Sequence, residues 1–255
     1  MLNSDENYKT EVMNNIYHVY NHDLLPPNHV KFLKFLNDSF KFTPLVIYDI
    51  GSAVLHWERH AKRIWPDSQI ICFDAFSPLE ELYKQCNIKY EIACLSDRDG
   101  VEQKFYQNDM LFGGNSLFRE IGFDNGSVFP EDNYILKQTK TLDSIVKDRN
   151  YLYPDLIKID AQGGELNILK GASECLNHAT YLIVELQHVE YNEGAVLARV
   201  VITYLAEIGW TLFSAKFSDN GPDADYCFVK LDKFVKQLNS SGSRYAPDPV
   251  FAFCP

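Results

Sequence analysis

The sequence lacks several features that would assign it to a common class of protein. Lysine and arginine number only 24, against 35 aspartate and glutamate residues, which gives a net charge of −11. Binding to nucleic-acid phosphates requires clustered positive charge, so we expect no nucleic-acid partner. There is no run of 18 apolar residues, and the amino terminus has no apolar segment behind a basic start. We therefore expect a soluble chain that neither enters a membrane nor is exported.

Metal and nucleotide motifs are missing as well. The six cysteines include no C-x-x-C pair, whereas zinc sites built on thiolates usually have closely spaced ligands. We interpret the cysteines in apolar runs as small core residues and expect a reducing, cytoplasmic compartment. Neither a P-loop motif nor a G-x-G-x-x-G fingerprint occurs, so a nicotinamide cofactor is not expected.

What the sequence does contain is enough apolar material for a large core, with 46% hydrophobic residues. Short apolar runs alternate with helical patterns, and near-continuous apolarity is typical of parallel strands buried on both faces. This pattern predicts an α/β fold with a mostly parallel sheet and helices on both faces. The runs cover residues 45–50, 69–74, 88–95, 155–160, 181–185, 210–214 and 226–231.

The composition divides the chain into three parts. Residues 1–42 read as an N-terminal helical extension that is interrupted at Pro26-Pro27 and has apolar residues three or four apart. Residues 43–231 contain the alternating pattern and form the expected α/β domain. Residues 232–255 read as a polar C-terminal tail. The extension would either cover an acceptor pocket or form a homodimer surface, and the sequence leaves both open.

Carboxylates gather where the predicted strands end, and an open α/β sheet binds ligands beyond the carboxyl ends of its strands. Gly51 follows the first run and allows a ligand to approach the backbone. Asp74 ends the next run, where a carboxylate can accept hydrogen bonds from both hydroxyls of a ribose. Asp160–Glu165 and Glu185–His188 follow two later runs.

Several segments resemble the FkbM family of S-adenosylmethionine-dependent methyltransferases. They are Tyr48-Asp-Ile-Gly51, Cys72-Phe-Asp-Ala-Phe-Ser-Pro78, Ala93-Cys-Leu-Ser-Asp97 and above all Ile157-Lys-Ile-Asp-Ala-Gln-Gly-Gly-Glu-Leu-Asn-Ile-Leu-Lys-Gly-Ala172, with Val184–Tyr191 similar to the family's fifth-strand segment. The resemblance covers residues 44–230. It implies a Rossmann-like class I methyltransferase fold with a seven-stranded, mostly parallel sheet, and S-adenosylmethionine as the cofactor. The implied reaction is O-methylation of a hydroxyl on a sugar or small metabolite.

The resemblance also implies roles for individual residues. The expected cofactor-binding residues are Asp49, Gly51, Ser52, Asp74, Ala75, Ala93, Cys94, Ser116 and Asp160. The expected catalytic residues are Asp160, Glu165, Glu185 and His188. A neutral hydroxyl is a poor nucleophile at pH 7, so a base is wanted within hydrogen-bond reach. Asp160 is our first candidate for that base, and His188 is the second because imidazole titrates nearest neutral pH.

Other interpretations remain open at this stage. Asp160, Glu165 and Glu185 could offer oxygen ligands to a divalent cation, although the sequence does not require one. Asp97-Arg-Asp99 and Asp223-Ala-Asp225 have the D-x-D spacing of nucleotide-sugar glycosyltransferases. A catalytically idle binding module on the same fold is the other alternative, because Leu55 stands where the family usually has a second glycine.

Overall fold

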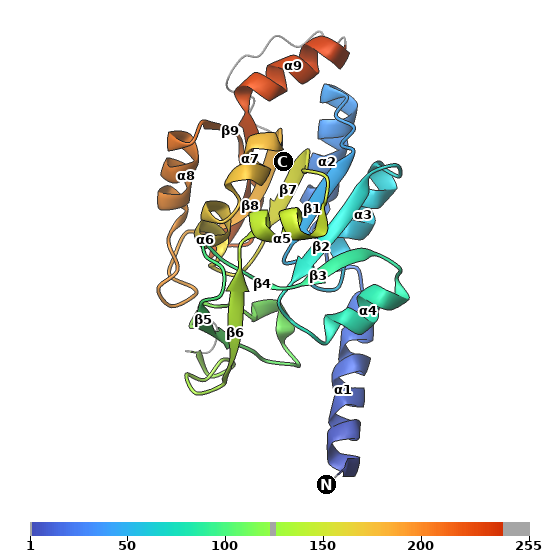
Figure 1. Cartoon of the computed structure of the whole chain (residues 1–255), viewed down its shortest axis with the longest axis vertical. Helices are drawn as coiled ribbons and strands as arrows, with labels where there is room; N and C mark the ends of the chain where they lie inside the picture. Colours follow the sequence, from blue (N-terminus) through green and yellow to red (C-terminus); the bar gives the residue numbers. More distant parts are fainter. Residues whose placement is uncertain (1, 123–125, 242–255) are drawn as a thin grey trace.

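The computed structural model describes residues 2–122 and 126–241, and a seven-stranded sheet forms the centre of this part of the chain (Figure 1). The strand order is β3-β2-β1-β7-β8-β10-β9. The strands from β3 to β8 are parallel to their neighbours, whereas β10 is antiparallel to both β8 and β9. The strands are β1 (Val46–Ile50), β2 (Gln69–Asp74), β3 (Lys89–Ile92), β7 (Leu156–Ile159), β8 (Tyr181–Gln187), β9 (Trp210–Asp219) and β10 (Asp223–Lys230). The predicted α/β class and mostly parallel sheet are confirmed.

Helices cover both faces of this sheet, as predicted. One face packs against α1 (Leu2–Asn21), α2 (Pro27–Phe40), α3 (His56–Ile64), α4 (Leu79–Gln85) and α9 (Leu231–Ser241). The other packs against α5 (Leu142–Arg149), α6 (Glu165–Lys170), α7 (Ser173–His178) and α8 (Ala198–Glu207). Because alternate residues of a strand point to opposite faces, a strand that is buried on both sides must be apolar throughout. All five residues of β1 are buried, and so are all four of β7.

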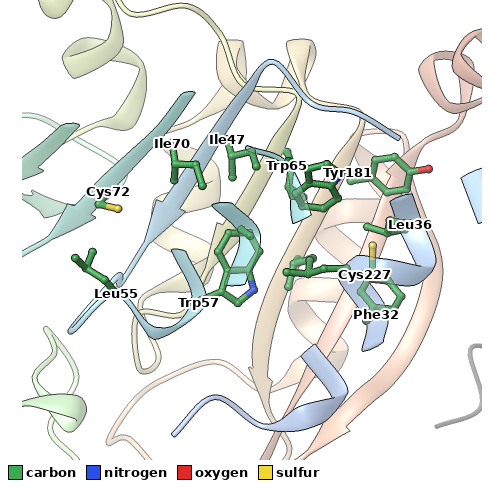
Figure 2. Close-up of a cluster of buried hydrophobic side chains, with 14 of the residues drawn as sticks. Phe32, Leu36, Ile47, Leu55, Trp57, Trp65, Ile70, Cys72, Tyr181 and Cys227 are labelled. Carbon is green, nitrogen blue, oxygen red and sulfur yellow. The ribbon is translucent and has the colours of Figure 1, made fainter. Parts of the chain in front are cut away.

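The N-terminal extension contains the two helices α1 and α2. Pro27 begins α2, where its missing N–H leaves no hydrogen bond unmade. Phe32, Leu33, Leu36 and Phe40 are buried at helical spacing, and they attach the extension to the sheet face shown in Figure 2. Burial of such a side chain contributes about 1.5–3 kcal/mol. The extension is therefore part of the domain's core.

Part of the expected C-terminal tail is also structured. Residues 231–241 form α9, whose Phe234 and Leu238 are buried in the same core cluster as α2. Residues 242–255 of the predicted tail lie outside the described residues. None of the helices in the described part of the chain is long and apolar enough to span a bilayer.

The prediction of one strand over residues 88–95 is wrong. The chain leaves β3 at Ile92, and Cys94–Leu95 form β4 in a separate sheet with the order β4-β6-β5. Neither β5 (Glu102–Tyr106) nor β6 (Tyr134–Lys140) was predicted. Most residues of these two strands remain exposed or half-buried, so they lack the apolar run that marked the central strands.

Candidate active site

A cavity lies at the carboxyl ends of β1, β2, β4 and β7, where an open parallel sheet is expected to bind its ligand. Seven of the predicted site residues line it: Gly51, Asp74, Ala75, Ala93, Cys94, Ser116 and Asp160. The structure also places three phenylalanines in the wall that the sequence did not single out: Phe73, Phe105 and Phe112. Two of these come from β5 and from the 3₁₀ turn Phe112–Gly114, and neither element was predicted. The cavity therefore combines carboxylates with an aromatic wall, an arrangement that can hold a nucleoside.

Gly51 brings the ends of β1 and β7 together. Its φ of +70° belongs to the left-handed region, and a Cβ at this position would lie 1.7 Å from the carbonyl oxygen of Asp160. Its own N–H donates to the carbonyl oxygen of Phe73 at 2.9 Å, which also fixes it to the end of β2. Only glycine satisfies both the backbone angle and the close approach.

Asp74 is held in the cavity wall by two backbone N–H groups. Its Oδ2 accepts from Ala53 at 2.9 Å, and its Oδ1 accepts from Phe76 at 2.8 Å. Each carboxylate oxygen accepts about two hydrogen bonds, so both retain capacity for a further donor. Burial raises the pKa of Asp74 above its usual value, against the lowering effect of these N–H groups. The residue is thereby fixed in orientation and still able to bind two neighbouring hydroxyls.

Asp49 and Ser52 lie behind the cavity and do not line it. Asp49 is fully buried, and neither of its oxygens accepts a hydrogen bond within the described part of the chain. Burial raises the pKa of Asp49 to about 6, although the cation of Lys158 opposes this shift. The hydroxyl of Ser52 lies 2.9 Å from that of Tyr83. Their predicted contact with a cofactor remains a prediction, and direct contact would require a shift of the wall.

Lys158 is a functional residue that the sequence analysis missed. Its Nζ lies 3.5 Å from Asp49 and 3.3 Å from Asp160, and it donates to the carbonyl oxygen of Gly51 at 3.2 Å. The side chain is 6% exposed, and although burial acts to lower its pKa, the neighbouring carboxylates keep that pKa above the usual value. A lysine inside an apolar strand, two residues before an aspartate, was the available signal, because residues i and i+2 share a face.

Gln162 joins two of the predicted catalytic carboxylates. Its side-chain amide donates to Asp160 Oδ1 at 3.0 Å and to Glu185 Oε2 at 2.9 Å. Burial acts to raise the pKa of Asp160, but Lys158 and hydrogen bonds from Glu185 and Gln162 hold it below its usual value. Burial and the charge of Asp160 raise the pKa of Glu185 well above its usual range. Within this pair, Asp160 is therefore the carboxyl group that ionises more readily, and Glu185 is the one that binds a proton more tightly.

Glu165 occupies a different place from the other predicted catalytic residues. It is buried beneath the loop after β7, and its Oε1 accepts from the backbone N–H groups of Ala161 and Gly163 at 2.9 and 3.1 Å. The hydroxyl of Ser116 binds the same loop through the carbonyl oxygen of Gln162 at 2.8 Å. Glu165 is absent from the cavity wall, so these contacts point to a positioning role for the loop that carries Gln162.

The burial of Glu165 predicts that the stability of the protein depends on pH. Burial raises the pKa of Glu165 from 4.5 to about 7, so the folded state binds its proton more tightly than the unfolded state does. The contribution of Glu165 to the free energy of unfolding is fully present below pH 4.5. It is lost as the pH rises through 7, by about 3 kcal/mol in total. We expect Glu165→Gln, which keeps the acceptor oxygen, to match the wild type at pH 4.5 and to be more stable at pH 8.

Urea unfolding of both proteins at the two pH values measures this difference. The exposed Glu174, in the first turn of α7, provides the control, and Glu174→Gln is expected to follow the wild type at both pH values. A constant offset between Glu165→Gln and the wild type would contradict the expectation.

His188 lies apart from the cavity wall, at the carboxyl end of β8. Its Nε2 is 3.4 Å from the hydroxyl of Tyr226, and the side chain is half-buried. Tyr226 belongs to the core cluster on the face of the sheet that carries α5 to α8, so the structure brings His188 into contact with neither Glu185 nor Asp160. Its catalytic role remains a prediction with less geometric support than that of Asp160.

Leu55 does not enter the cavity. Its side chain is 1% exposed and belongs to the core cluster under the sheet, with Trp57 and Cys72 on the same face (Figure 2). The residue has a φ of +63° at the start of α3, which is unfavourable for leucine. The glycine missing from the family motif is therefore replaced by a core anchor, and the space beside Gly51 stays open.

We expect Leu55→Gly to destabilise the protein without improving its affinity for the cofactor. Loss of a buried leucine costs about 2–5 kcal/mol, while relief of the left-handed backbone returns about 1–2 kcal/mol. Urea unfolding should show a net loss, and calorimetric titration with S-adenosylmethionine should give an affinity close to that of the wild type. A large gain in affinity would show that Leu55 obstructs the site.

The two D-x-D segments are occupied by structural contacts. Asp99 Oδ1 accepts from the N–H of Thr141 at 2.6 Å and from the hydroxyl of Ser144 at 2.8 Å. Asp225 lies 2.8 Å from His29. Among the residues that the structure describes, no group of three or more His, Cys, Asp or Glu side chains is arranged to hold a metal ion.

The strand order, with an antiparallel strand inserted next to the edge strand, and the cavity beyond β1 and β2 define a Rossmann-like class I methyltransferase, whose cofactor is S-adenosylmethionine. The residues present fit that cofactor. The glycine at position 51 leaves room beside the backbone, Asp74 has acceptor capacity for a ribose, and the negative charge of Asp160 suits a sulfonium. A family model described as "Methyltransferase FkbM domain" matches residues 61–212, more than half of the chain. The chain belongs to the FkbM methyltransferase family.

Comparisons with other proteins add only distant likenesses. A search among curated proteins finds no match. Among solved structures, precorrin-6y C5,15-methyltransferase from Geobacter metallireducens is 10% identical, with a TM-score of 0.43 over 78% of this chain and 87% of that one. An O-methyltransferase family protein from Burkholderia thailandensis is 6% identical, with a TM-score of 0.43 over 79% of this chain and 55% of that one.

Human N-acetylserotonin methyltransferase, solved in complex with S-adenosylmethionine, is 9% identical, with a TM-score of 0.40. That match covers 79% of this chain, which spans about half (55%) of the human protein. The assignment of the class follows from the strand order and the family match, not from these likenesses.

Proposed function

We propose that this methyltransferase acts on a hydroxyl group of a sugar or small metabolite, with Asp160 as the general base. The observation that carries the proposal is the state of Asp160. It lines the cofactor cavity, its side chain is 31% exposed, and Lys158 stabilises its negative charge. It is thus an ionised carboxylate that both the cofactor and a second molecule can reach.

The arrangement suits the removal of a proton from a neutral acceptor. When bound, S-adenosylmethionine supplies a methyl group on a positively charged sulfur, which keeps the electron pair of the broken C–S bond. Asp160 accepts the hydroxyl proton as the oxygen forms its bond to carbon, and general-base help of this kind contributes about 10²–10⁴-fold. Gln162 fixes the carboxylates of Asp160 and Glu185 relative to each other, so the base is held in position.

We propose a hydroxylated acceptor because the sheet carries polar side chains next to Asp160. Beyond Asp160, the carboxyl end of β8 and the start of β10 offer Glu185, His188 and Asp223, all half-buried. Carboxylates and imidazole can bind several hydroxyls at once, which favours a sugar or polyhydroxylated metabolite over an apolar acceptor.

The test is a panel of sugars and hydroxylated metabolites incubated with S-adenosylmethionine, with released S-adenosylhomocysteine as the signal. We expect turnover with hydroxylated acceptors and methylation at oxygen, identified by mass spectrometry of the product. Methylation at nitrogen or carbon instead would overturn the proposed chemistry. Thermal stabilisation by a UDP-sugar, without stabilisation by S-adenosylhomocysteine, would favour the glycosyltransferase alternative.

A further inference from the structure

A buried pair of residues outside the family match lies directly behind the carboxylates of the site. His29 is on α2 in the N-terminal extension, and Asp225 is on β10. His29 Nε2 lies 2.8 Å from Asp225 Oδ2, and the two residues are 5% and 2% exposed. A carboxylate buried beside a histidine ring is costly to desolvate unless its contacts offset the cost, so this pair calls for an explanation.

The register of the sheet connects this pair with the site. Asp225 is the direct partner of Glu185 in the antiparallel pairing of β10 with β8. Paired residues on adjacent strands point to the same face, so the two carboxyl groups are neighbours. Glu185 in turn shares Gln162 with Asp160. A continuous row of polar side chains thus runs from His29 through Asp225 and Glu185 to Asp160.

The charges of these side chains determine how the row affects Glu185 and Asp160. Asp225 is one of the negative groups that raise the pKa of Glu185, after burial, Asp160 and Asp223. His29 Nε2 lies within hydrogen-bonding distance of Asp225 Oδ2, at 2.8 Å, and holds that carboxylate in place beside Glu185. On the other side, Lys158 stabilises the ionised form of Asp160. Repulsion from Asp225 and attraction from Lys158 therefore act in the same sense on the pair between them.

We infer that His29 and Asp225 are positioning residues that keep the shared proton of the Asp160–Glu185 pair on Glu185, which leaves Asp160 ionised. The N-terminal extension thereby contributes to the chemistry of the site, in addition to its packing. The inference rests on the proposed function only for the use of Asp160 as a base. The location of the proton is a property of the protein without any ligand.

Other charged groups also face Glu185. Asp160 and Lys158 approach it from β7, and Asp223 lies beside Asp225 on β10 and adds repulsion. Asp49 of β1 acts through Lys158, and His188, on β8 itself, opposes the rise in the pKa of Asp223 that burial causes. None of these groups changes in the variants below, so a shift between variants reports on His29 and Asp225.

The test is the titration of Glu185 in the full-length, ligand-free protein. Labelling glutamate with ¹³C at the side-chain carboxyl gives an NMR signal for each residue, and Glu185→Gln identifies the one that belongs to Glu185. In the wild type, we expect a midpoint far above the ordinary range of glutamate. Asp225→Asn removes the negative charge, keeps the shape, and should lower that midpoint by about one pH unit or more.

Two replacements of His29 complete the test. His29→Leu removes the ring nitrogen that holds Asp225 in place, so the Glu185 midpoint should fall toward that of Asp225→Asn. His29→Gln can place an amide N–H where the ring N–H was, and should restore the midpoint to within about 0.3 pH units of the wild type. A purely structural role for the pair would change stability and leave all midpoints in place.

A midpoint that stays unchanged or rises in Asp225→Asn overturns the inference, even if His29→Leu fails to fold. A failure of the proposed function would look different. If no hydroxylated acceptor is methylated at oxygen, the proposed reaction is wrong while the titration shifts remain. If the titration shifts are absent while acceptors are methylated at oxygen, only the role of His29 and Asp225 is wrong.

Discussion

Replacing Gly51 with alanine is expected to reduce cofactor affinity by about 100-fold or more, which corresponds to about 2.7 kcal/mol of binding free energy. The added Cβ would lie 1.7 Å from the carbonyl oxygen of Asp160, so the ends of β1 and β7 must separate. The left-handed backbone adds strain of about 1–2 kcal/mol, and the steric conflict adds about 1–3 kcal/mol. Calorimetric titration with S-adenosylhomocysteine measures the affinity.

Gly194→Ala is the matched control for this variant. Gly194 has a φ of +76°, but no atom lies within 4 Å of the position that its Cβ would take. This variant should therefore carry the backbone strain without the steric conflict, and it should bind S-adenosylhomocysteine as the wild type does. Equal affinities for Gly51→Ala and the wild type would mean that the cofactor does not depend on the β1–β7 junction.

The second large effect is expected from Asp160→Asn, with an acceptor identified in the panel. The amide keeps the shape of the side chain but accepts no proton, so kcat should fall by about 100- to 10,000-fold. Affinity for S-adenosylhomocysteine should remain within about tenfold, the effect of one altered hydrogen bond. Steady-state kinetics together with calorimetry separate the two quantities.

Asp232→Asn is the control for loss of a carboxylate. Asp232 is on α9, and its side chain is 64% exposed. This variant should retain the kcat of the wild type. If Asp160→Asn also retained it, Asp160 would be a binding residue at most, and the proton would leave by another route.

The central sheet could be predicted because its physical signal is local in the sequence. The residues of β1, β2, β7 and β8 form short apolar runs, and the carboxylates Asp74 and Asp160 lie at or just after the end of their strands. The strand ends then share one edge because parallel strands align them. The family match covers β2, β7 and β8 of these strands.

The remaining parts depend on contacts between distant residues. The pairing of His29 with Asp225 joins positions 196 residues apart, and nothing near either position signals it. The aromatic wall depends on β5, in which only Phe105 is buried, so no strand-like pattern marks it. Leu55 is similar: its place in the family motif suggested an obstruction, whereas the turn before α3 directs its side chain into the core.

The central claim is that the cavity beside Gly51 and Asp74 binds S-adenosylmethionine, and a crystal structure of the protein soaked with S-adenosylhomocysteine tests it most directly. The account predicts that the two ribose hydroxyls donate to the carboxylate of Asp74 and that the homocysteine part lies beside Gly51, with its sulfur facing Asp160. A structure in which Asp74 contacts no nucleoside and the cavity beside Gly51 remains empty, at a ligand concentration that saturates other members of the class, would contradict it.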